Sequence, residues 1–446
     1  MLIDLRVADD PETGENTAAT HPFRPIGGQS KDIRARRPRV LVIAYAGEPG
    51  RGSEPGAGWG IVRAVSEFAD CVVLTGPEHT AGIQQWLQIN EDATSFVEVP
   101  EPRGASAAKK HRTTWFLLYL WWLRRAYQLG RSLHAAAPFD AIYHATYSTY
   151  WLPTPAVRFA VPSIWGPVGG GVTTPLPLWG ALGWRGIPGE LLDWLAVRIL
   201  ALLPATRRTW RRATVRLVQN EATLSRLPES VRAKARVLNH ALFTEVPAQG
   251  SSVRGRHCLL VASLERRKGV RLALLALACT PADIRLAVIG DGPDYGSLKR
   301  LACKLGVADR VEFTGKATRE QVLASMSRAA AVIFTGLREE GGITLAEAMM
   351  CGAPVVVLAH GGAATIASCA TDPSRVAMVP PGDLLQTARD IGSAMTRFSR
   401  HPPSAQGPTL DQRWAREELR AIFEEAVTCR GSAERLGYAP GPVSSR

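Results

Sequence analysis

Short apolar runs alternate with amphipathic segments along most of the chain. In the first half, apolar runs over 39–46, 71–76, 139–145 and 161–167 have the length of buried strands, and the segment 59–69 has the spacing of an amphipathic helix. A strand, a helix and a second strand in this order form a βαβ unit, which implies a parallel sheet. The first half therefore predicts one α/β domain.

The second half repeats the alternation with greater regularity. We expect strands over 258–264, 284–292, 310–315, 330–336 and 353–359, with helices over 269–278, 295–306, 318–327 and 343–350. Strands and helices that alternate in this way form a doubly wound sheet, in which ligands bind at the carboxyl ends of the strands. The turns that follow four of these strands are therefore expected to converge on one crevice.

A stretch rich in Pro, Gly and Ser, at 243–256, separates the two regions of α/β rhythm. A length of 446 residues also fits two domains with tails. We therefore predict an N-terminal domain over 38–243 and a C-terminal domain over 257–400. The remaining segments are predicted as a flexible tail over 1–37, a helical segment over 401–430 and a second flexible tail over 431–446.

Two segments combine apolar and basic residues. The run WFLLYLWWL at 115–123, within an expected helix over 115–137, is too short to cross a bilayer. Basic residues on both sides are typical of a helix that lies on anionic lipid, whereas a core helix with a solvated basic end explains them equally well. The Arg-studded stretch 190–216 predicts an amphipathic helix with a basic face, which plain solvated surface also explains.

The composition is that of a globular protein in a reducing compartment. Hydrophobic residues make up 46% and charged residues 21%, and the seven cysteines are scattered without a CxxC pair, which indicates buried free thiols. The N-terminus lacks the basic start and apolar run of a signal peptide, so we expect a cytoplasmic protein. A net charge of +13 favours anionic partners, namely the phosphates of a small ligand, a lipid surface or nucleic acid.

The most informative stretch is TGLREEGGITLAEAMMCGAPVVV, in which Glu339 and Glu347 stand eight positions apart around Gly341 and Gly342. An expected strand leads into this loop, and the two glycines allow the backbone to approach a ligand closely. The helix that begins near Ile343 directs free N–H groups and its positive dipole end toward a phosphate. Both glutamates are then placed to accept hydrogen bonds from ribose or hexose hydroxyls. A helix whose surface glutamates only pair with neighbours is the alternative.

This stretch resembles the E-x7-E signature of the family 4 retaining glycosyltransferases, with Glu339 and Glu347 on its two glutamate positions. GSEPGAGW at 52–59 is similar to the glycine-rich loop with which these enzymes approach donor and acceptor, and WGPVGGG at 165–171 resembles a signature of one of their bacterial branches. The resemblance covers about 39–400. It implies the GT-B fold, an α/β architecture of two Rossmann-like doubly wound domains that face each other across a cleft.

The resemblance also assigns roles to single residues. Lys268, in SLERRKG, is placed to neutralise the departing diphosphate. The family usually has an Arg five residues before this Lys, but Ser263 stands there, so Arg266 or Arg267 is a candidate substitute; solvated surface is the other interpretation of both arginines. His144, at the end of an expected strand, matches a histidine beside the sugar, whereas a hydrogen-bonded core histidine is the alternative.

The resemblance implies retaining transfer of a sugar from a nucleoside-diphosphate sugar to a hydroxyl acceptor, with the leaving phosphate taking the acceptor proton. It implies no metal and no cofactor, and the sequence has no DxD-type pair at a strand end. The predicted catalytic residues are Glu339, His144 and Lys268. The predicted substrate-binding residues are Gly56, Gly58, Gly169, Gly170, Arg267, Gly341, Gly342, Ile343, Thr344 and Glu347.

Three other functions remain open at this point. A sugar-nucleotide epimerase or phosphorylase shares the two-domain architecture, although the E-x7-E stretch together with WGPVGGG argues against both. A non-catalytic protein that binds sugar nucleotides or glycans is supported only by Ser263 in place of the usual Arg. A nucleic-acid partner is motivated by charge alone, and no RNP, KH or zinc-finger pattern is present, so we expect none.

Overall fold

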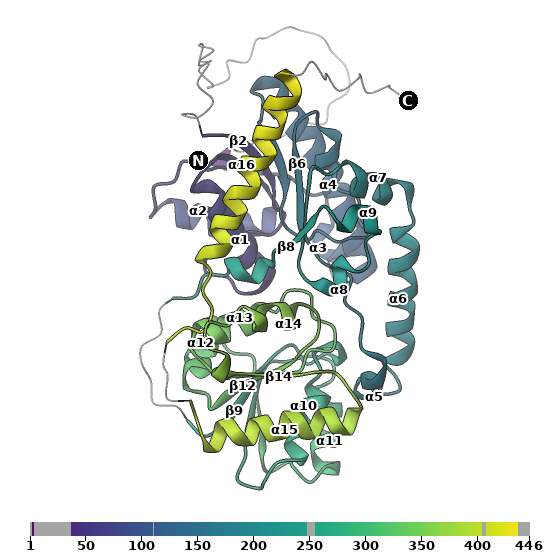
Figure 1. Cartoon of the computed structure of the whole chain (residues 1–446), viewed down its shortest axis with the longest axis vertical. Coiled ribbons are helices and arrows are strands. Elements are labelled where there is room, and N and C mark those ends of the chain that lie inside the picture. The colour runs from purple at the N-terminus through teal and green to yellow at the C-terminus, as the bar shows by residue number, and fades with distance from the viewer. Residues whose placement is uncertain (1, 4–36, 110, 248–254, 404–406, 436–446) are drawn as a thin grey trace.

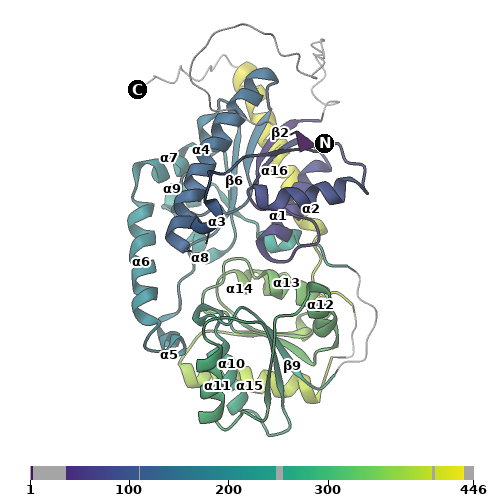
Figure 2. The same cartoon turned by 180° about the vertical axis from the view of Figure 1, so that it is seen from behind.

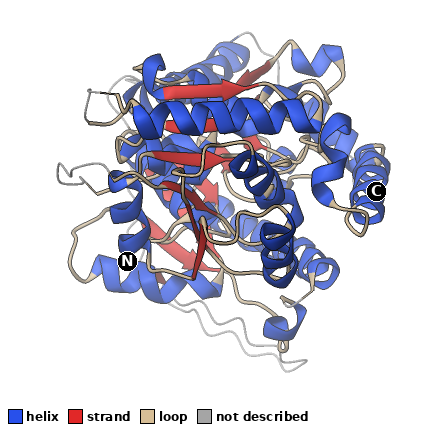
Figure 3. Cartoon of the chain, turned by 90° about the horizontal axis from the view of Figure 1, so that it is seen from below, coloured by secondary structure: helices blue, strands red, loops and turns tan. Residues whose placement is uncertain are grey.

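The computed structural model contains two α/β domains stacked along the long axis of the molecule (Figure 1). It describes residues 2–3, 37–109, 111–247, 255–403 and 407–435. Every strand pair within the two sheets is parallel. Helices cover both faces of the strands, as Figure 3 shows from below. The central strands are therefore buried on both sides, which explains why they are almost continuously apolar.

The N-terminal sheet has the strand order β1-β4-β3-β2-β5-β6-β7-β8. Its strands are β1 (Leu2–Ile3), β2 (Arg39–Ile43), β3 (Asp70–Thr75), β4 (Ser95–Glu98), β5 (Ala141–His144), β6 (Ser163–Val168), β7 (Val215–Val218) and β8 (Ala235–Val237). The helices in this part of the chain are α1 (Ser53–Ser66), α2 (Pro77–Leu87), α3 (Ala105–Ala108), α4 (Arg112–Ala136), α5 (Trp179–Leu182), α6 (Ile187–Ala201), α7 (Pro204–Arg212), α8 (Glu221–Leu224) and α9 (Glu229–Arg232).

The C-terminal sheet has the order β11-β10-β9-β12-β13-β14. Its strands are β9 (Cys258–Val261), β10 (Leu286–Ile289), β11 (Val311–Gly315), β12 (Ala331–Phe334), β13 (Val355–Leu358) and β14 (Val376–Val379). The helices that follow β9 are α10 (Val270–Ala278), α11 (Tyr295–Lys304), α12 (Arg319–Arg328), α13 (Ile343–Met350), α14 (Gly361–Ser368), α15 (Leu384–Arg400) and α16 (Arg413–Arg435).

Both sheets reverse their strand order at one point. In the N-terminal sheet this switch point lies between β2 and β5, and in the C-terminal sheet it lies between β9 and β12. Doubly wound sheets of this order bind ligands at the switch point, outside the carboxyl ends of the strands. The predicted α/β class with two Rossmann-like doubly wound domains is confirmed.

Two expected elements differ from the structure. The stretch 52–59 is expected as a glycine-rich loop, but α1 already begins at Ser53, so Gly56 and Gly58 are helical. The single helix expected over 190–216 is wrong. Leu203 precedes Pro204, which has no N–H and stands at the first position of α7, so α6 and α7 are separate helices and the last residues enter β7.

The predicted ends of the chain are partly corrected. Leu2–Ile3 forms an edge strand that pairs with β4, and α16 continues to Arg435, beyond the expected boundary at 430. Arg37, the last residue of the expected first tail, instead contacts the N-terminal domain, with its Nε 3.1 Å from Oδ1 of Asp70. The remaining residues of both predicted tails, 1, 4–36 and 436–446, lie outside the described residues. α16 packs on the N-terminal domain (Figures 1 and 2), where the ring of Phe423 lies 5.4 Å from that of Phe68 and 5.4 Å from that of Tyr143.

The aromatic helix expected over 115–137 is α4, and most of its large side chains belong to the core. Trp122 is fully buried, and Tyr119 and Leu123 are nearly so. Leu117 and Trp121 are its exposed apolar residues among those described. The core interpretation therefore accounts for most of this helix. No helix in the described part of the chain combines the length and apolar character that a membrane span needs.

Candidate active site at the switch point of the C-terminal sheet

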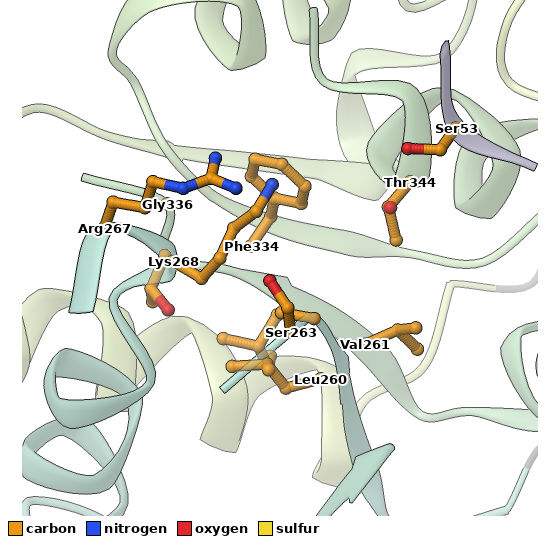
Figure 4. A pocket seen from close by; sticks show the side chains of 12 residues that line it. Ser53, Leu260, Val261, Ser263, Arg267, Lys268, Phe334, Gly336 and Thr344 are labelled. Atoms are coloured by element: carbon orange, nitrogen blue, oxygen red, sulfur yellow. The ribbon is translucent and has the colours of Figure 1, made fainter. Parts of the chain in front are cut away.

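A cavity of ≈ 240 Å³ lies at the carboxyl ends of β9 and β12 (Figure 4). Ser53, at the start of α1, reaches the cavity from the N-terminal domain, so both domains contribute to its wall. Lys268 and Arg267 supply positive charge, and none of the described residues that line the cavity is acidic. Such a site is suited to an anionic ligand.

Lys268 is held at the cavity by a tight turn. Arg266–Lys268 forms a short 3-10 helix, and Gly269 follows with φ +69°, a conformation that favours glycine. A Cβ at Gly269 would overlap the carbonyl oxygen of Thr335, so this turn packs closely on the end of β12. The ammonium Nζ of Lys268 lies 2.6 Å from Oε2 of Glu339. The structure thus brings these two predicted residues into direct contact.

The two candidate arginines point to different places. Arg267 lines the cavity, and its Nε also donates to Oε2 of Glu265 at 2.8 Å. Arg266 is instead directed at Asp294, with Nε 3.5 Å from Oδ1. Ser263 lies in the cavity wall as well. Arg267 is therefore the arginine that adds positive charge near Ser263.

The N-terminus of α13 also faces this region. Gly342 precedes Ile343 with φ +73°, and Thr344, the second helical residue, lines the cavity. The first N–H groups of a helix have no partner within the helix, and they favour an anion through the helix dipole. Gly341 serves close packing across the domains, because a Cβ there would overlap the ring of His240.

Glu347 lies one turn into α13 and is 6% exposed. Arg319 Nη2 donates to its Oε1 at 3.0 Å. Burial raises the pKa of Glu347 above its usual range, although the Arg319 guanidinium acts in the opposite direction. A Cβ on Gly52 would lie 3.7 Å from the same Oε1, so this carboxylate is close to the start of α1. The pair Arg319–Glu347 is one that the sequence pattern did not predict.

The other predicted glycines are packing residues in this structure. A Cβ on Gly56 would overlap the carbonyl oxygen of Arg51, and a Cβ on Gly58 would overlap that of Ala46. Gly169 approaches the side chain of Gln219. Gly170 has φ +90°, and a side chain there would meet the indole of Trp151. None of these four glycines lines the cavity, and their binding role stays a prediction.

His144 ends β5 and is 1% exposed. Its Nε2 lies 3.0 Å from the Tyr119 hydroxyl, and its Nδ1 lies 2.9 Å from Oγ1 of Thr154. Burial lowers the pKa of His144 to about 3. This is the geometry of a neutral, hydrogen-bonded core histidine, the alternative raised by the sequence, and it offers no free ring nitrogen to a substrate.

Glu340 joins the two domains, a role that the sequence pattern did not reveal. Its carboxylate accepts hydrogen bonds from the backbone N–H of Val172 at 2.9 Å, from Nδ2 of Asn220 at 3.1 Å and from the hydroxyl of Thr223 at 3.2 Å. The neighbouring Arg338 contacts α6, with Nη2 3.0 Å from Oδ2 of Asp193. Only the adjacency of Glu340 to Glu339 in the motif could have drawn attention to it.

In the described part of the chain, no group of three or more His, Cys, Asp or Glu residues is arranged to hold a metal ion. The six described cysteines are free thiols, as predicted, but the expected burial holds only for Cys71 and Cys258, and Cys279 and Cys303 are exposed. Cys429 lies among the side chains that are not described. Independence from metal ions stays a prediction.

Comparisons with known proteins agree with this picture. The family model for glycosyl transferases group 1 matches residues 245–388, which include both glutamates of the motif and every lining residue of the cavity except Ser53. A GDP-mannose-dependent alpha-(1-6)-phosphatidylinositol monomannoside mannosyltransferase of Mycolicibacterium smegmatis is 30% identical over 272 residues, which cover 51% of this chain and 68% of that protein. The chain belongs to the group 1 glycosyltransferase family.

Two further relatives match over shorter segments. A 2-deoxystreptamine N-acetyl-D-glucosaminyltransferase of Streptomyces fradiae is 32% identical over 34% of this chain, and a 2-deoxystreptamine glucosyltransferase of Streptomyces kanamyceticus is 27% identical over 44% of it. The matches span only 37% and 52% of the lengths of these two relatives.

Two solved structures share the fold of this chain. HepE of Anabaena, in complex with UDP and glucose, superimposes with a TM-score of 0.51 at 16% identity, over 87% of this chain and 100% of HepE. The lipopolysaccharide outer core galactosyltransferase WaaB gives a TM-score of 0.52 at 13% identity, over 87% and 99%. The two facing domains are therefore those of the GT-B fold.

Proposed function

We propose that this chain transfers a sugar from a nucleoside-diphosphate sugar to a hydroxyl acceptor, with retention of the anomeric configuration. The observation that carries the proposal is the cavity between β9 and β12, where Lys268 and Arg267 meet the N-terminus of α13 and no described lining side chain is acidic. Transfer leaves a nucleoside diphosphate, whose growing charge such a site stabilises.

The contact between Lys268 and Glu339 gives the proposed site two states. Without donor, the ammonium and the carboxylate neutralise each other at 2.6 Å. A bound diphosphate competes for Lys268, which frees the carboxylate of Glu339 to accept hydrogen bonds from hydroxyls of the donor sugar. Glu347, which lies in α13 and close to the start of α1, is the proposed acceptor for ribose hydroxyls.

Retention is proposed from the resemblance of the E-x7-E stretch to the retaining glycosyltransferases, and the cavity lining bears on how retention is achieved. A double-displacement mechanism needs a carboxylate nucleophile beside the reacting carbon, and the described lining contains none. In the proposed mechanism the acceptor attacks from the same side as the departing diphosphate, whose oxygen takes the acceptor proton. Hydrogen bonds that join the domains, such as those of Glu340, would keep the site closed to water during transfer.

The nucleotide base is identified by a thermal-shift panel with UDP, GDP, dTDP and ADP. A ligand at 100 times its dissociation constant adds about 2.7 kcal/mol of stability. We expect one base to give the largest shift. HepE was solved with UDP, and the mycolicibacterial relative is named as GDP-mannose-dependent, so both bases are leading candidates.

The test of the function is turnover with the sugar nucleotides of the selected base, in the presence of EDTA, with the anomer of the product or of released sugar read by proton NMR. We expect retained configuration and no requirement for metal. Glu339→Gln should mainly lower kcat, and Glu347→Gln should mainly raise the donor KM, whereas the exposed Glu320→Gln serves as matched control. Equal kinetics for all three variants would reject the roles assigned to the motif.

A second candidate is a non-catalytic protein that binds sugar nucleotides. Its support is Ser263, which replaces the usual arginine in the cavity wall. A thermal shift without transfer or donor hydrolysis at any measurable rate would favour it.

A further inference from the structure

Helix α6 presents an apolar surface to solvent. Figures 1 and 2 both show α6 at the outer edge of the molecule, beside the two domains, with α7 at its upper end. The exposed apolar side chains of this helix and its end are Leu191, Leu192, Trp194, Leu195, Ile199, Leu202 and Leu203, with exposed fractions from 38% to 67%. Positions 191, 195, 199 and 202 are three or four residues apart and therefore form one stripe.

The inner face of α6 is polar near the start of the helix. Oε2 of Glu190 lies 3.3 Å from Nη1 of Arg338, and Oδ2 of Asp193 lies 3.0 Å from Nη2 of the same guanidinium. Glu190 also accepts a hydrogen bond from the backbone N–H of Thr174 at 3.1 Å. Toward the end of the helix, Val197 and Ala201 pack into the apolar core. The helix is therefore attached by both polar and apolar contacts, while its exposed leucines remain uncovered.

A row of arginines begins one turn after this stripe. Arg207, Arg208, Arg211 and Arg212 are exposed on α7, and their spacing places them on one face of that helix. None of the four has an acidic partner within salt-bridge distance among the described residues. At the other end of the stripe, Trp184 is 77% exposed.

We propose that α6 and α7 form a docking surface for an anionic lipid bilayer. An apolar stripe alone fits any apolar partner, but the adjoining arginine face restricts the partner to an anionic one. Leucine, isoleucine and tryptophan on one side with arginine beside them are typical of helices that lie in the interface of a membrane. Apolar side chains enter the acyl boundary, and the guanidinium groups bind lipid phosphates.

This surface replaces the one expected from the sequence, which was α4. There Trp122 and Leu123 are buried in the domain core, and among the described residues only Leu117 and Trp121 are exposed large apolar side chains, at 60% and 37%. The α6 surface also lies close to the candidate active site, because Arg338, which binds the inner face of α6, is the residue before Glu339. Docking therefore places the cavity next to the bilayer. The proposal does not depend on the transfer reaction.

The test is co-sedimentation of the full chain with vesicles at low salt. Vesicles of phosphatidylcholine with phosphatidylglycerol are compared with vesicles of phosphatidylcholine alone. We expect binding to the anionic vesicles that weakens with salt. Leu192→Glu with Leu195→Glu should lower the affinity roughly tenfold or more, and Arg208→Ala with Arg212→Ala should lower it roughly fivefold per arginine.

Two matched substitutions of exposed leucines serve as controls. Leu385→Glu on α15, where the wild-type residue is 54% exposed, and Leu117→Glu on α4 should bind like the wild type. Thermal melting of every variant verifies that it is folded. The proposal is overturned if the wild type does not sediment, if the α6 variant binds as well as the controls, or if Leu117→Glu alone abolishes binding. It is also overturned if light scattering shows a dimer that the α6 variant loses, because a second copy would then cover the stripe.

Discussion

The switch points of the two sheets have the same topology but different contents. Between β9 and β12 there is a cavity with Lys268 and Arg267 in its wall. Between β2 and β5, α1 packs at this point, and Gly58 lies so close to the carbonyl oxygen of Ala46 that no side chain fits. The backbone N–H of Ala46 lies 3.2 Å from Oγ1 of Thr146, which joins the two strand ends. A doubly wound sheet thus supplies the place for a ligand, and the side chains decide whether a ligand or a helix occupies it.

Glycines illustrate the same difference. At the C-terminal switch point, Gly269 and Gly342 have positive φ and position a lysine and a helix N-terminus at the cavity. At the N-terminal switch point, Gly56 and Gly58 are helical and allow α1 to approach the backbone. The first pair shapes the wall of the cavity, and the second pair allows close packing of α1.

The largest effect should come from Lys268→Ala. Removal of the cation that faces the diphosphate should lower kcat/KM for the donor about 100- to 1000-fold. Lys299→Ala, which removes an exposed lysine of the same domain, should leave kcat/KM for the donor unchanged. The two variants are compared by initial rates of product formation. Similar rates for both would mean that the cavity of the C-terminal sheet is not the donor site.

Gly58→Ala should act on stability instead of donor binding. The added methyl group would overlap the Ala46 carbonyl, which should lower the free energy of unfolding by about 1–3 kcal/mol. Gly189→Ala in α6, where a Cβ meets no atom within 4 Å, should be neutral or stabilising by up to about 1 kcal/mol. Urea unfolding measures both. A Gly58→Ala variant with normal stability and weakened nucleotide affinity would instead assign this glycine to the ligand site.

Glu340→Gln should have a smaller effect, which acts on the contact between the two domains. The substitution removes the charge that strengthens the hydrogen bonds from Val172 and Asn220, so we expect the free energy of unfolding to fall by about 1 kcal/mol. Nucleotide affinity in the thermal-shift assay should stay the same. Glu312→Gln, at an exposed position of β11, is the control. A strong loss of nucleotide binding would show that Glu340 acts in the donor site.

The smallest effect at neutral pH is expected from His144→Gln. The pKa of His144 is lowered by burial from 6.5 to about 3, so the unfolded chain binds more protons than the folded one between these values. Wild-type stability should therefore fall as the pH falls from 6.5 toward 3, by at most about 1.4 kcal/mol per pH unit from this group. In urea titrations, the free energy of unfolding of the variant should depend less on pH than that of the wild type. If both proteins show the same dependence and the variant also loses most of its turnover, a catalytic role for His144 is supported.

The strands β9 to β13 and the helices α10 to α13 were predicted because short loops separate them and most of these strands are compact apolar runs. The elements α14, β14 and α15, which follow them, were not predicted. The interpretation of 190–216 failed at Pro204, whose missing N–H outweighs the continuous amphipathic pattern around it. The glycines of α1 were misplaced for another reason. A glycine in the sequence indicates that another group packs closely against the backbone at that position. It does not show whether that group is a ligand phosphate or a neighbouring strand.

The contacts of the candidate site were predictable only within one domain. Lys268 and Glu339 were recognised separately by their motif positions, and the fold brings them together. Glu340 was missed because its partner Asn220 lies 120 positions earlier in the sequence and carries no pattern of its own. The environment of His144 depends on Tyr119 and Thr154, which meet it only after the sheet has formed.

The return of α16 to the N-terminal domain has a consequence for synthesis on the ribosome. Phe423 packs against Phe68 and Tyr143, so the first domain to be translated is completed by a helix near the end of the sequence. The intervening domain takes roughly 10 to 30 seconds to translate at about 5–20 residues per second. During that interval the α16 binding surface on the nascent N-terminal domain remains open. This surface is therefore where trigger factors and other holding chaperones are expected to engage the growing chain.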